Sequence, residues 1–395
     1  MMMDWTIEFL KAIGRFFLHP LFYYFILVTL AYGYFRIKRE RRSFHVRVED
    51  IYDEIRFTYS KGLLSGVILS VILFAAGAAL PFGTVVVLAL VTFFLSLTFR
   101  VRWLSAAFSL GFTFIVSYVL INQENSYIER FFIDIEKTNF SSLAILVGLV
   151  LVVEGVLVYR SAHIKTSPFL KISTRGLPIG NHVSNRTWML PLLFLVPGGS
   201  LTSIVSWWPV LTINGEPFLL LFIPFFLGFH QRVQGSLPQE SIKITAKRIS
   251  ILGAITTVVA CFSIIWTPLM FAAIVIAIIG REFLTIKQRM NDDSAAFYFS
   301  KRDVGLVVLG TLPNSPAQKF NLQVGEIIMK VNGINVKTVE EFYEALQTYG
   351  ASCKLEIVGL NGEVRFEKRA FYENEHHELG ILFVRDEKKW DTAAV

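Results

Sequence analysis

Long apolar runs alternate with short polar loops up to about residue 280, and the pattern changes after residue 302. The runs are 16–35, 63–80, 82–99, 103–121, 143–159, 188–205, 217–229 and 249–280. Most are long enough to cross a bilayer as a helix, which takes about 20 apolar residues. The last run is too long for one span, and Trp266-Thr267-Pro268 is its expected break. The pattern predicts a polytopic α-helical membrane domain of about eight spans, with seven to nine possible.

Two stretches beside these runs are predicted to be amphipathic helices. Residues 1–15 place Trp5, Phe9 and Ile13 on one helical face, as in a segment lying at a membrane interface. The basic loop 36–62 carries an apolar stripe at helical spacing. It is interpreted either as a helix resting on the membrane surface or, with equal weight, as a packed connector.

The distribution of charge predicts the orientation in the membrane. Loops 36–62, 100–102, 160–186 and 230–248 hold 19 Lys and Arg, whereas 122–142 and 206–216 on the opposite side hold 2. By the positive-inside rule, the basic loops and the C-terminal region are expected in the cytosol. An odd number of spans places the N-terminus outside and an even number inside; Lys11 and Arg15 favour the inside.

Composition supports a membrane protein and makes nucleic-acid binding a poor interpretation. The chain is 53% hydrophobic and only 17% charged. Its net charge of +7 comes from the part before residue 281, because the rest of the chain is slightly acidic. The two cysteines, Cys261 and Cys353, fall in an apolar run and in the C-terminal region, so no disulfide is expected.

The C-terminal region predicts a small α+β domain. Short strands are expected at 304–309, 326–331, 354–358, 363–371 and 379–384, with Asn332-Gly333 and Asn361-Gly362 as turns. Ser315 followed by Pro316 is a helix start. Thr338 with Glu341 is a capping box, and it begins a helix that continues to Thr348.

These elements resemble a PDZ domain of the bacterial, circularly permuted type. Residues 315–317 (SPA), 324–328 (VGEII) and 331–333 (VNG) carry the resemblance, and Glu326 stands where the family usually has Asp. PDZ domains bind an extended peptide as an added strand between a strand edge and a helix. The implied groove residues are Leu379, Gly380, Ile381, Gly305, Leu306, Phe342, Ala345 and Leu346. Of the two glycine loops, the one at Gly380 is favoured for holding the peptide carboxylate, and either glycine could instead serve only strand packing.

A catalytic site is not evident. None of the seven histidines forms the His-Glu-x-x-His motif of a zinc protease, and no phosphate-binding loop occurs. His376 and His377 are expected to be solvated in a turn. Glu154 is the one ionisable residue clearly inside a run, and it is expected to reach or pair with a basic group at the cytosolic side. A transporter using Glu154, or a regulatory subunit of a membrane protease, stays open as an alternative.

The whole chain resembles the family of MinJ-like cell-division topological determinants. Residues 16–23 (FFLHPLFY), the arginine-rich first loop and the single terminal PDZ-like region carry this resemblance. It implies a scaffold, not an enzyme, that links a DivIVA-like polar protein to a MinD-like ATPase and restricts septation to mid-cell. It also implies enrichment at septum and poles, with no cofactor, metal, nucleic acid or small-molecule substrate. The expected parts are an N-terminal segment 1–15, membrane domain 16–280, linker 281–302, PDZ domain 303–386 and tail 387–395.

Overall fold

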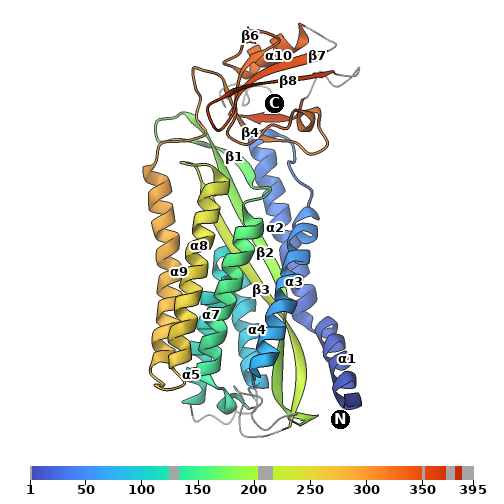
Figure 1. The fold of residues 1–395 in the computed structure, drawn as a ribbon, viewed down its shortest axis with the longest axis vertical. Helices are drawn as coiled ribbons and strands as arrows, with labels where there is room; N and C mark the ends of the chain where they lie inside the picture. The colour runs from blue at the N-terminus through green and yellow to red at the C-terminus, as the bar shows by residue number, and fades with distance from the viewer. Residues whose placement is uncertain are drawn as a thin grey trace, which may run out of the picture.

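A computed structural model describes residues 2–123, 132, 134–202, 217–348, 352–370 and 379–384. Figure 1 shows a long bundle of helices with a small β-rich domain seated on one end. We call this end of the bundle the PDZ-like end and the opposite one the far end. Helix α1, the first of the chain, lies at the far end, across the bundle from the β-rich domain. This is the arrangement expected for an odd number of spans, the alternative to the inside location that Lys11 and Arg15 favour.

Helices at the expected positions form most of the bundle. They are α1 (Met2–Leu18), α2 (Pro20–Phe44), α3 (Asp53–Ala76), α4 (Phe82–Leu97), α5 (Ala106–Ile121), α7 (Phe140–Leu157), α8 (Pro238–Phe262) and α9 (Leu269–Ser294), with short turns η1 (Val101–Leu104), η2 (Ile135–Lys137) and η3 (Val158–Ala162). Among the described residues, five helices are long and apolar enough to cross a membrane: α2, α3, α7 with η3, α8 and α9. Helices α4 and α5 are shorter and apolar. By their length and composition, these helices are consistent with a membrane protein that has several candidate spans.

The described residues of these two runs, 188–202 and 217–229, are not helical, so the prediction of helical spans there is wrong. They lie in and directly beside two long antiparallel strands, β2 (Pro178–Leu201) and β3 (Phe218–Val233), with β1 (Ser167–Ile172) beside β2. Pro191 pairs with Pro224 in this hairpin, and a proline inside a helix would break its hydrogen bonding. A strand also rises about 3.3 Å per residue, so a run too short for a helical span is long enough as a strand.

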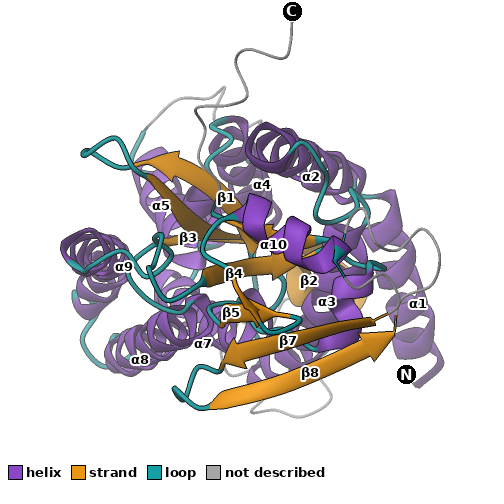
Figure 2. Cartoon of the chain, turned by 90° about the horizontal axis from the view of Figure 1, so that it is seen from above, coloured by secondary structure: helices purple, strands orange, loops and turns teal. Residues whose placement is uncertain are grey.

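The hairpin is enclosed by helices, and backbone groups of β2 that face away from β3 bond to α3 and to the residues between α3 and α4. Figures 1 and 2 show the strands running through the middle of the bundle. The Ser70 hydroxyl of α3 donates to the Pro191 carbonyl (2.6 Å) and accepts from the Leu193 N–H (3.0 Å). The Leu195 N–H donates to the Ala78 carbonyl, and the Leu195 carbonyl accepts from Leu80. Such partners are necessary because apolar surroundings offer none to an open strand edge.

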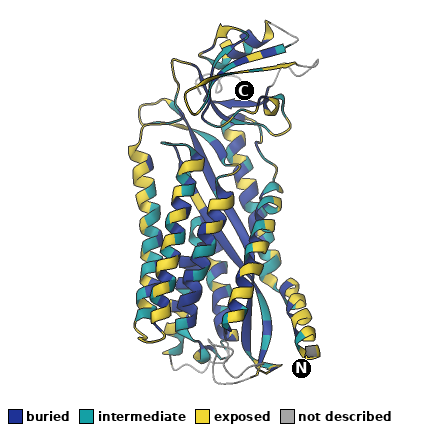
Figure 3. Cartoon of the chain, viewed as in Figure 1, coloured by how far each residue is buried: buried dark blue, intermediate teal, exposed yellow. Residues whose placement is uncertain are grey.

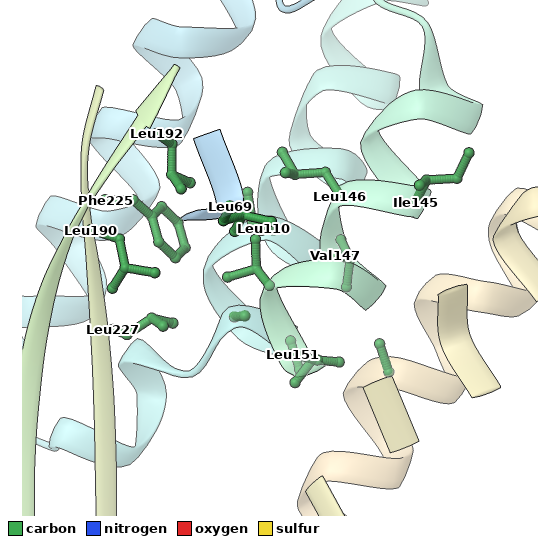
Figure 4. Packing of buried hydrophobic residues seen from close by; sticks show 14 of the residues in the cluster. Leu69, Leu110, Ile145, Leu146, Val147, Leu151, Leu190, Leu192, Phe225 and Leu227 are labelled. Carbon is green, nitrogen blue, oxygen red and sulfur yellow. The ribbon is translucent and has the colours of Figure 1, made fainter. Parts of the chain in front are cut away.

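Small residues allow the helices to approach the hairpin and each other closely. A Cβ on Gly62 of α3 would lie 2.7 Å from the Met189 carbonyl oxygen of β2. Gly148, Gly155 and Gly253 play the same part between α7 and α8. Figure 4 shows hairpin residues such as Leu190, Leu192, Phe225 and Leu227 packed with Leu69 and Leu110 in the main core.

The outward faces of the helices carry exposed apolar side chains, as lipid-facing surfaces do. Figure 3 shows exposed residues along the outside of the bundle and buried ones along its axis. On α3 the exposed set includes Leu64, Val67, Ile68, Val71 and Ile72. In water such a surface would be unfavourable, and in a bilayer it is expected.

The polar segments between spans are shorter than expected. Helix α2 runs on to Phe44 and α3 begins at Asp53, so the loop 36–62 contains no separate surface helix and matches the packed-connector alternative. Helix α9 continues to Ser294, well into the stretch 281–302 that was interpreted as a linker.

Helix α1 lies against β3, where the Arg15 side chain donates a hydrogen bond to the Leu220 carbonyl.

The described residues of the C-terminal domain form one sheet and one α-helix. Its elements are β4 (Leu306–Thr311), η4 (Pro316–Phe320), β5 (Ile327–Val331), β6 (Ile334–Asn335), α10 (Val339–Gln347), β7 (Ser352–Val358), β8 (Val364–Ala370) and β9 (Ile381–Phe383). The strand order is β8-β7-β5-β4-β9, with β6 paired to β5. Thr338 and Glu341 form the predicted capping box at the start of α10, which confirms that assignment.

An apolar seam joins the C-terminal domain to the bundle. Phe44 and Val48 pack in one buried cluster with Phe299, Leu309 and Leu382. Within this seam the Gly180 N–H of β2 donates to the Phe299 carbonyl at 2.8 Å. The two faces of β9 are thus used differently: Leu382 packs into the seam, and the residues before and after it face the domain's own core.

Candidate peptide site of the C-terminal domain

Strand β9 is an edge of the sheet and lies beside α10. Among the described residues it pairs with β4 alone, through Val308 with Phe383 and Thr311 with Ile381. The ring centroids of Phe342 in α10 and Phe383 in β9 lie 5.1 Å apart. A strand edge next to a helix is the arrangement by which an extended peptide is bound through its backbone.

The apolar residues expected in the groove are brought together, but they are buried in the core. Phe342, Ala345 and Leu346 of α10 belong to one buried cluster. Leu379, two residues before β9, and Ile381, its first residue, belong to the same cluster, as does Leu306. Their first role is therefore to hold the helix and the strand to the sheet, and each is at most 4% exposed.

The two candidate glycine loops lie at opposite ends of β4. Gly380 precedes β9, and its carbonyl accepts from the Leu312 N–H just after β4. Gly305 immediately precedes β4 and packs against the Ile328 backbone of β5, as in the strand-packing interpretation. The structure therefore separates Gly305 from the edge of β9 that Gly380 adjoins.

Gly380 is required by the fold itself. Its φ is +78°, and a Cβ there would lie 2.5 Å from the Ser315 side chain. A large residue at this position would therefore disturb the domain before it disturbed any ligand. The neighbouring His376 and His377 lie outside the described residues.

Sequence reasoning missed two half-buried residues on α10. Val339 and Tyr343 are four residues apart, so they share a face of the helix. Both pack against the margin of the core instead of inside it. The amphipathic pattern of α10 contained this information, since half-buried positions flank the buried stripe.

Glu326 explains the one departure from the PDZ motif. Its carboxylate is buried, accepts the Gln323 N–H at 2.8 Å and pairs with Arg365 of β8 at 2.8 Å. The hydrogen bond that Arg365 donates to this carboxylate raises the pKa of Arg365 above its ordinary value. Glu326 thus connects the turn before β5 to the outer strand β8.

Cys353 is a free cysteine whose thiol is buried in the domain core. Burial raises the pKa of this thiol to about 12.

Glu154 was expected to reach or pair with a basic group, and inside the bundle it pairs with Arg281. It is fully buried on α7 and accepts from Ser105 Oγ (2.7 Å) and the Ala106 N–H (2.9 Å). Arg281 Nε of α9 lies 3.2 Å from the carboxylate. The group therefore links three segments of the bundle.

A second buried ion cluster near the PDZ-like end was not predicted. Glu54 of α3 accepts from Arg36 of α2 and from Arg186 of β2, each at 2.8 Å. Arg186 also donates to the Ile164 and Lys165 carbonyls. No sequence signal indicates that residues this far apart along the chain would be paired.

Among the described residues, no group of three or more His, Cys, Asp or Glu side chains could hold a metal ion.

Comparisons with known proteins agree with this architecture. A PDZ domain family matches residues 307–358, and PDZ domains are protein-interaction modules. The cell division topological determinant MinJ of Bacillus subtilis is 53% identical over 399 aligned positions, covering 100% of this chain and 99% of the relative. A probable MinJ of Lacticaseibacillus paracasei is 21% identical over 91% of this chain and 94% of its own. With a PDZ module carried on a membrane bundle and similarity of this extent, the chain belongs to the MinJ family of cell division topological determinants.

Proposed function

We propose that this protein is a membrane-anchored scaffold that binds division proteins through its PDZ domain. The observation that carries the proposal is the edge strand β9 beside α10, on a domain held against a membrane bundle. The family supplies the process, division-site selection. The permuted order of PDZ elements, in which the last strand completes the groove, is part of the same proposal.

The partners we propose are a DivIVA-like polar scaffold and a MinD-like ATPase. A protein that binds both would restrict septum formation to mid-cell and would be enriched at septa and poles. Such bridging needs binding surfaces but no turnover, so we propose that the protein is not an enzyme. The paired state of Glu154 supports this, because a carboxylate held by three donors is poorly placed to carry a substrate.

The peptide would add to the free edge of β9 and cover the half-buried face of α10. Backbone hydrogen bonds to β9 would give affinity, and side-chain contacts at Val339 and Tyr343 would give selectivity. The buried groove residues Phe342, Ala345 and Leu346 would shape the floor of the groove from beneath. The Gly380 turn would set where the peptide ends.

The test is Val339→Asp in the full chain. A carboxylate at the first position of α10 suits the helix dipole, so the domain should stay folded while an apolar peptide contact is lost. Binding to purified DivIVA-like and MinD-like proteins should fall at least tenfold for the partner that uses the groove. Ile334→Asp is the matched control, because Ile334 is exposed on β6, away from β9. Unchanged binding of both partners to a folded Val339→Asp protein would reject the groove.

The orientation we propose places the PDZ-like end in the cytosol, because the basic loops gather there. A phosphatase reporter that works only outside the membrane should be inactive after Ser173 and after Val395. Activity at Val395 would place the PDZ domain on the wrong side for cytosolic partners. Uniform membrane fluorescence of a tagged chain would argue against septal and polar enrichment.

A further inference from the structure

A cavity of about 690 Å³ opens at the PDZ-like end between α2, η1 and α9. Its wall changes from aromatic to basic. Tyr32, Phe35 and Phe99 line one part, and the arginines Arg39, Arg100, Arg102, Arg232 and Arg289 line another. All lie where an apolar helix or, for Arg232, the apolar strand β3 passes into polar sequence, which is the level of a membrane–water interface.

Positive charge in this cavity is not fully neutralised. Five arginines and two aspartates, Asp292 and Asp293, line it, a formal net charge of +3. The Asp292 carboxylate accepts hydrogen bonds from the backbone N–H groups of Gln234 and Gly235. Arg102 pairs with Glu282, and Arg232 lies 3.6 Å from Asp293. Counting Glu282 still leaves an excess of positive charge.

Several guanidinium groups are open to a further acceptor. The Arg39 guanidinium donates one hydrogen bond to the Ser167 hydroxyl at 3.1 Å. In the part of the chain that the structure describes, no ion pair joins Arg39 or Arg100 to a carboxylate. The Nε atoms of Arg39 and Arg102 are buried without a hydrogen-bond partner among those residues. Donors of this kind suit the oxygens of a phosphate group.

Apolar surface continues directly from the cavity. Phe35 and Phe99 are 49% and 56% exposed, and their ring centroids lie 5.7 Å apart. Leu27 on α2 and Phe94 and Leu97 on α4 are exposed further along the bundle. A ligand with a phosphate head and hydrocarbon chains matches this order of surfaces, whereas a free anion would use only the arginines.

We propose that this cavity binds the headgroup of an anionic phospholipid. The phosphate contacts the arginines around Arg100, and the acyl chains lie along the exposed apolar faces of α2 and α4. Bound lipid would then stabilise the end of the bundle on which the PDZ domain is seated. Basic pockets between membrane helices recognise lipid headgroups in this way.

The test compares the full chain with Arg100→Gln/Arg289→Gln in nanodiscs of phosphatidylcholine containing phosphatidylglycerol, with retained lipid counted by native mass spectrometry. The affinity for phosphatidylglycerol should fall roughly 30-fold, about fivefold for each arginine. The control Lys171→Gln/Arg175→Gln removes the same charge from exposed positions at the same end, and it should bind like the wild type. Arg100→Lys/Arg289→Lys should retain most binding.

Two results would overturn the proposal. Equal loss in the Lys171→Gln/Arg175→Gln control would show that lipid is attracted by surface charge alone. Protection against thermal unfolding by inorganic phosphate, with the same dependence on Arg100 and Arg289 and no preference for phosphatidylglycerol, would assign the cavity to a free anion. Thermal unfolding of each variant in neutral lipid tells a binding defect from a folding defect.

Discussion

The two sheets of this protein differ in how their edges are covered. In the bundle, β2 has its edge groups occupied by Ser70, by residues 78–80 and by β1. In the PDZ domain, β9 has β4 on one side and no strand on the other among the described residues. An open edge is costly where only hydrocarbon surrounds it, but it is tolerated at a surface where water or a peptide can pair with it. The same backbone chemistry is therefore structural in one region and available for binding in the other.

The largest effect is expected where a charge is buried in the bundle. Arg281→Leu leaves the Glu154 carboxylate without its cation and should cost about 3–5 kcal/mol of stability, read as a lower unfolding temperature in detergent micelles. Lys287→Leu on the same helix is the control, because Lys287 is exposed and lies outside the basic cavity. The double variant Glu154→Leu/Arg281→Leu should recover much of the loss. Equal effects of Arg281→Leu and Lys287→Leu would contradict the pairing.

A smaller effect is expected from uncovering the strand edge in the bundle. Ser70→Ala leaves the Leu193 N–H and the Pro191 carbonyl unsatisfied in apolar surroundings, at a cost of about 1–3 kcal/mol. Ser60→Ala on the exposed part of the same helix should change the unfolding temperature little. A Ser70→Ala protein as stable as Ser60→Ala would mean that the edge finds other partners and that the contrast between the sheets is weaker.

In the PDZ domain the comparison is between two glycines with positive φ. Gly380→Ala meets Ser315 as well as backbone strain, whereas Gly333→Ala, at φ +85°, meets no atom within 4 Å. Gly380→Ala should therefore destabilise the chain by about 1 kcal/mol more than Gly333→Ala. Thermal unfolding of both variants measures this difference. Equal destabilisation would show that the Gly380 turn can move, as a turn adjusting to a ligand would.

The smallest effect concerns Glu49, which lines a cavity between the bundle and the PDZ domain. Burial, with a hydrogen bond to Asp53, raises the pKa of Glu49 from 4.5 to about 7. The folded chain therefore holds a proton that the unfolded chain releases between these pH values, so stability should fall as pH rises from 4.5 to 7. Lys165 nearby and partial exposure limit the change to less than about 1 kcal/mol. Glu49→Gln should flatten the dependence measured between pH 5 and pH 8, and parallel curves for the two proteins would contradict this account.

Much of the architecture could be predicted from the sequence because its signals are local. The apolar runs at α2, α3, α7, α8 and α9 predicted helices of spanning length. The SPA, VGEII and VNG segments and the Thr338 capping box predicted the PDZ fold and the start of α10. In each case neighbouring residues supply the cause, whether a cap, a turn or a continuous apolar stretch.

The tertiary structure decided what depends on distant partners. Runs 188–205 and 217–229 are apolar on every face, so they show neither a helical nor a strand period, and only enclosure by the bundle makes a buried hairpin stable. Glu154 and Arg281 are 127 residues apart, and Glu54 is joined to Arg36 and Arg186 across three segments. The sequence contains these charges but not their pairing, because the electrostatic gain that keeps them buried exists only once the segments have packed.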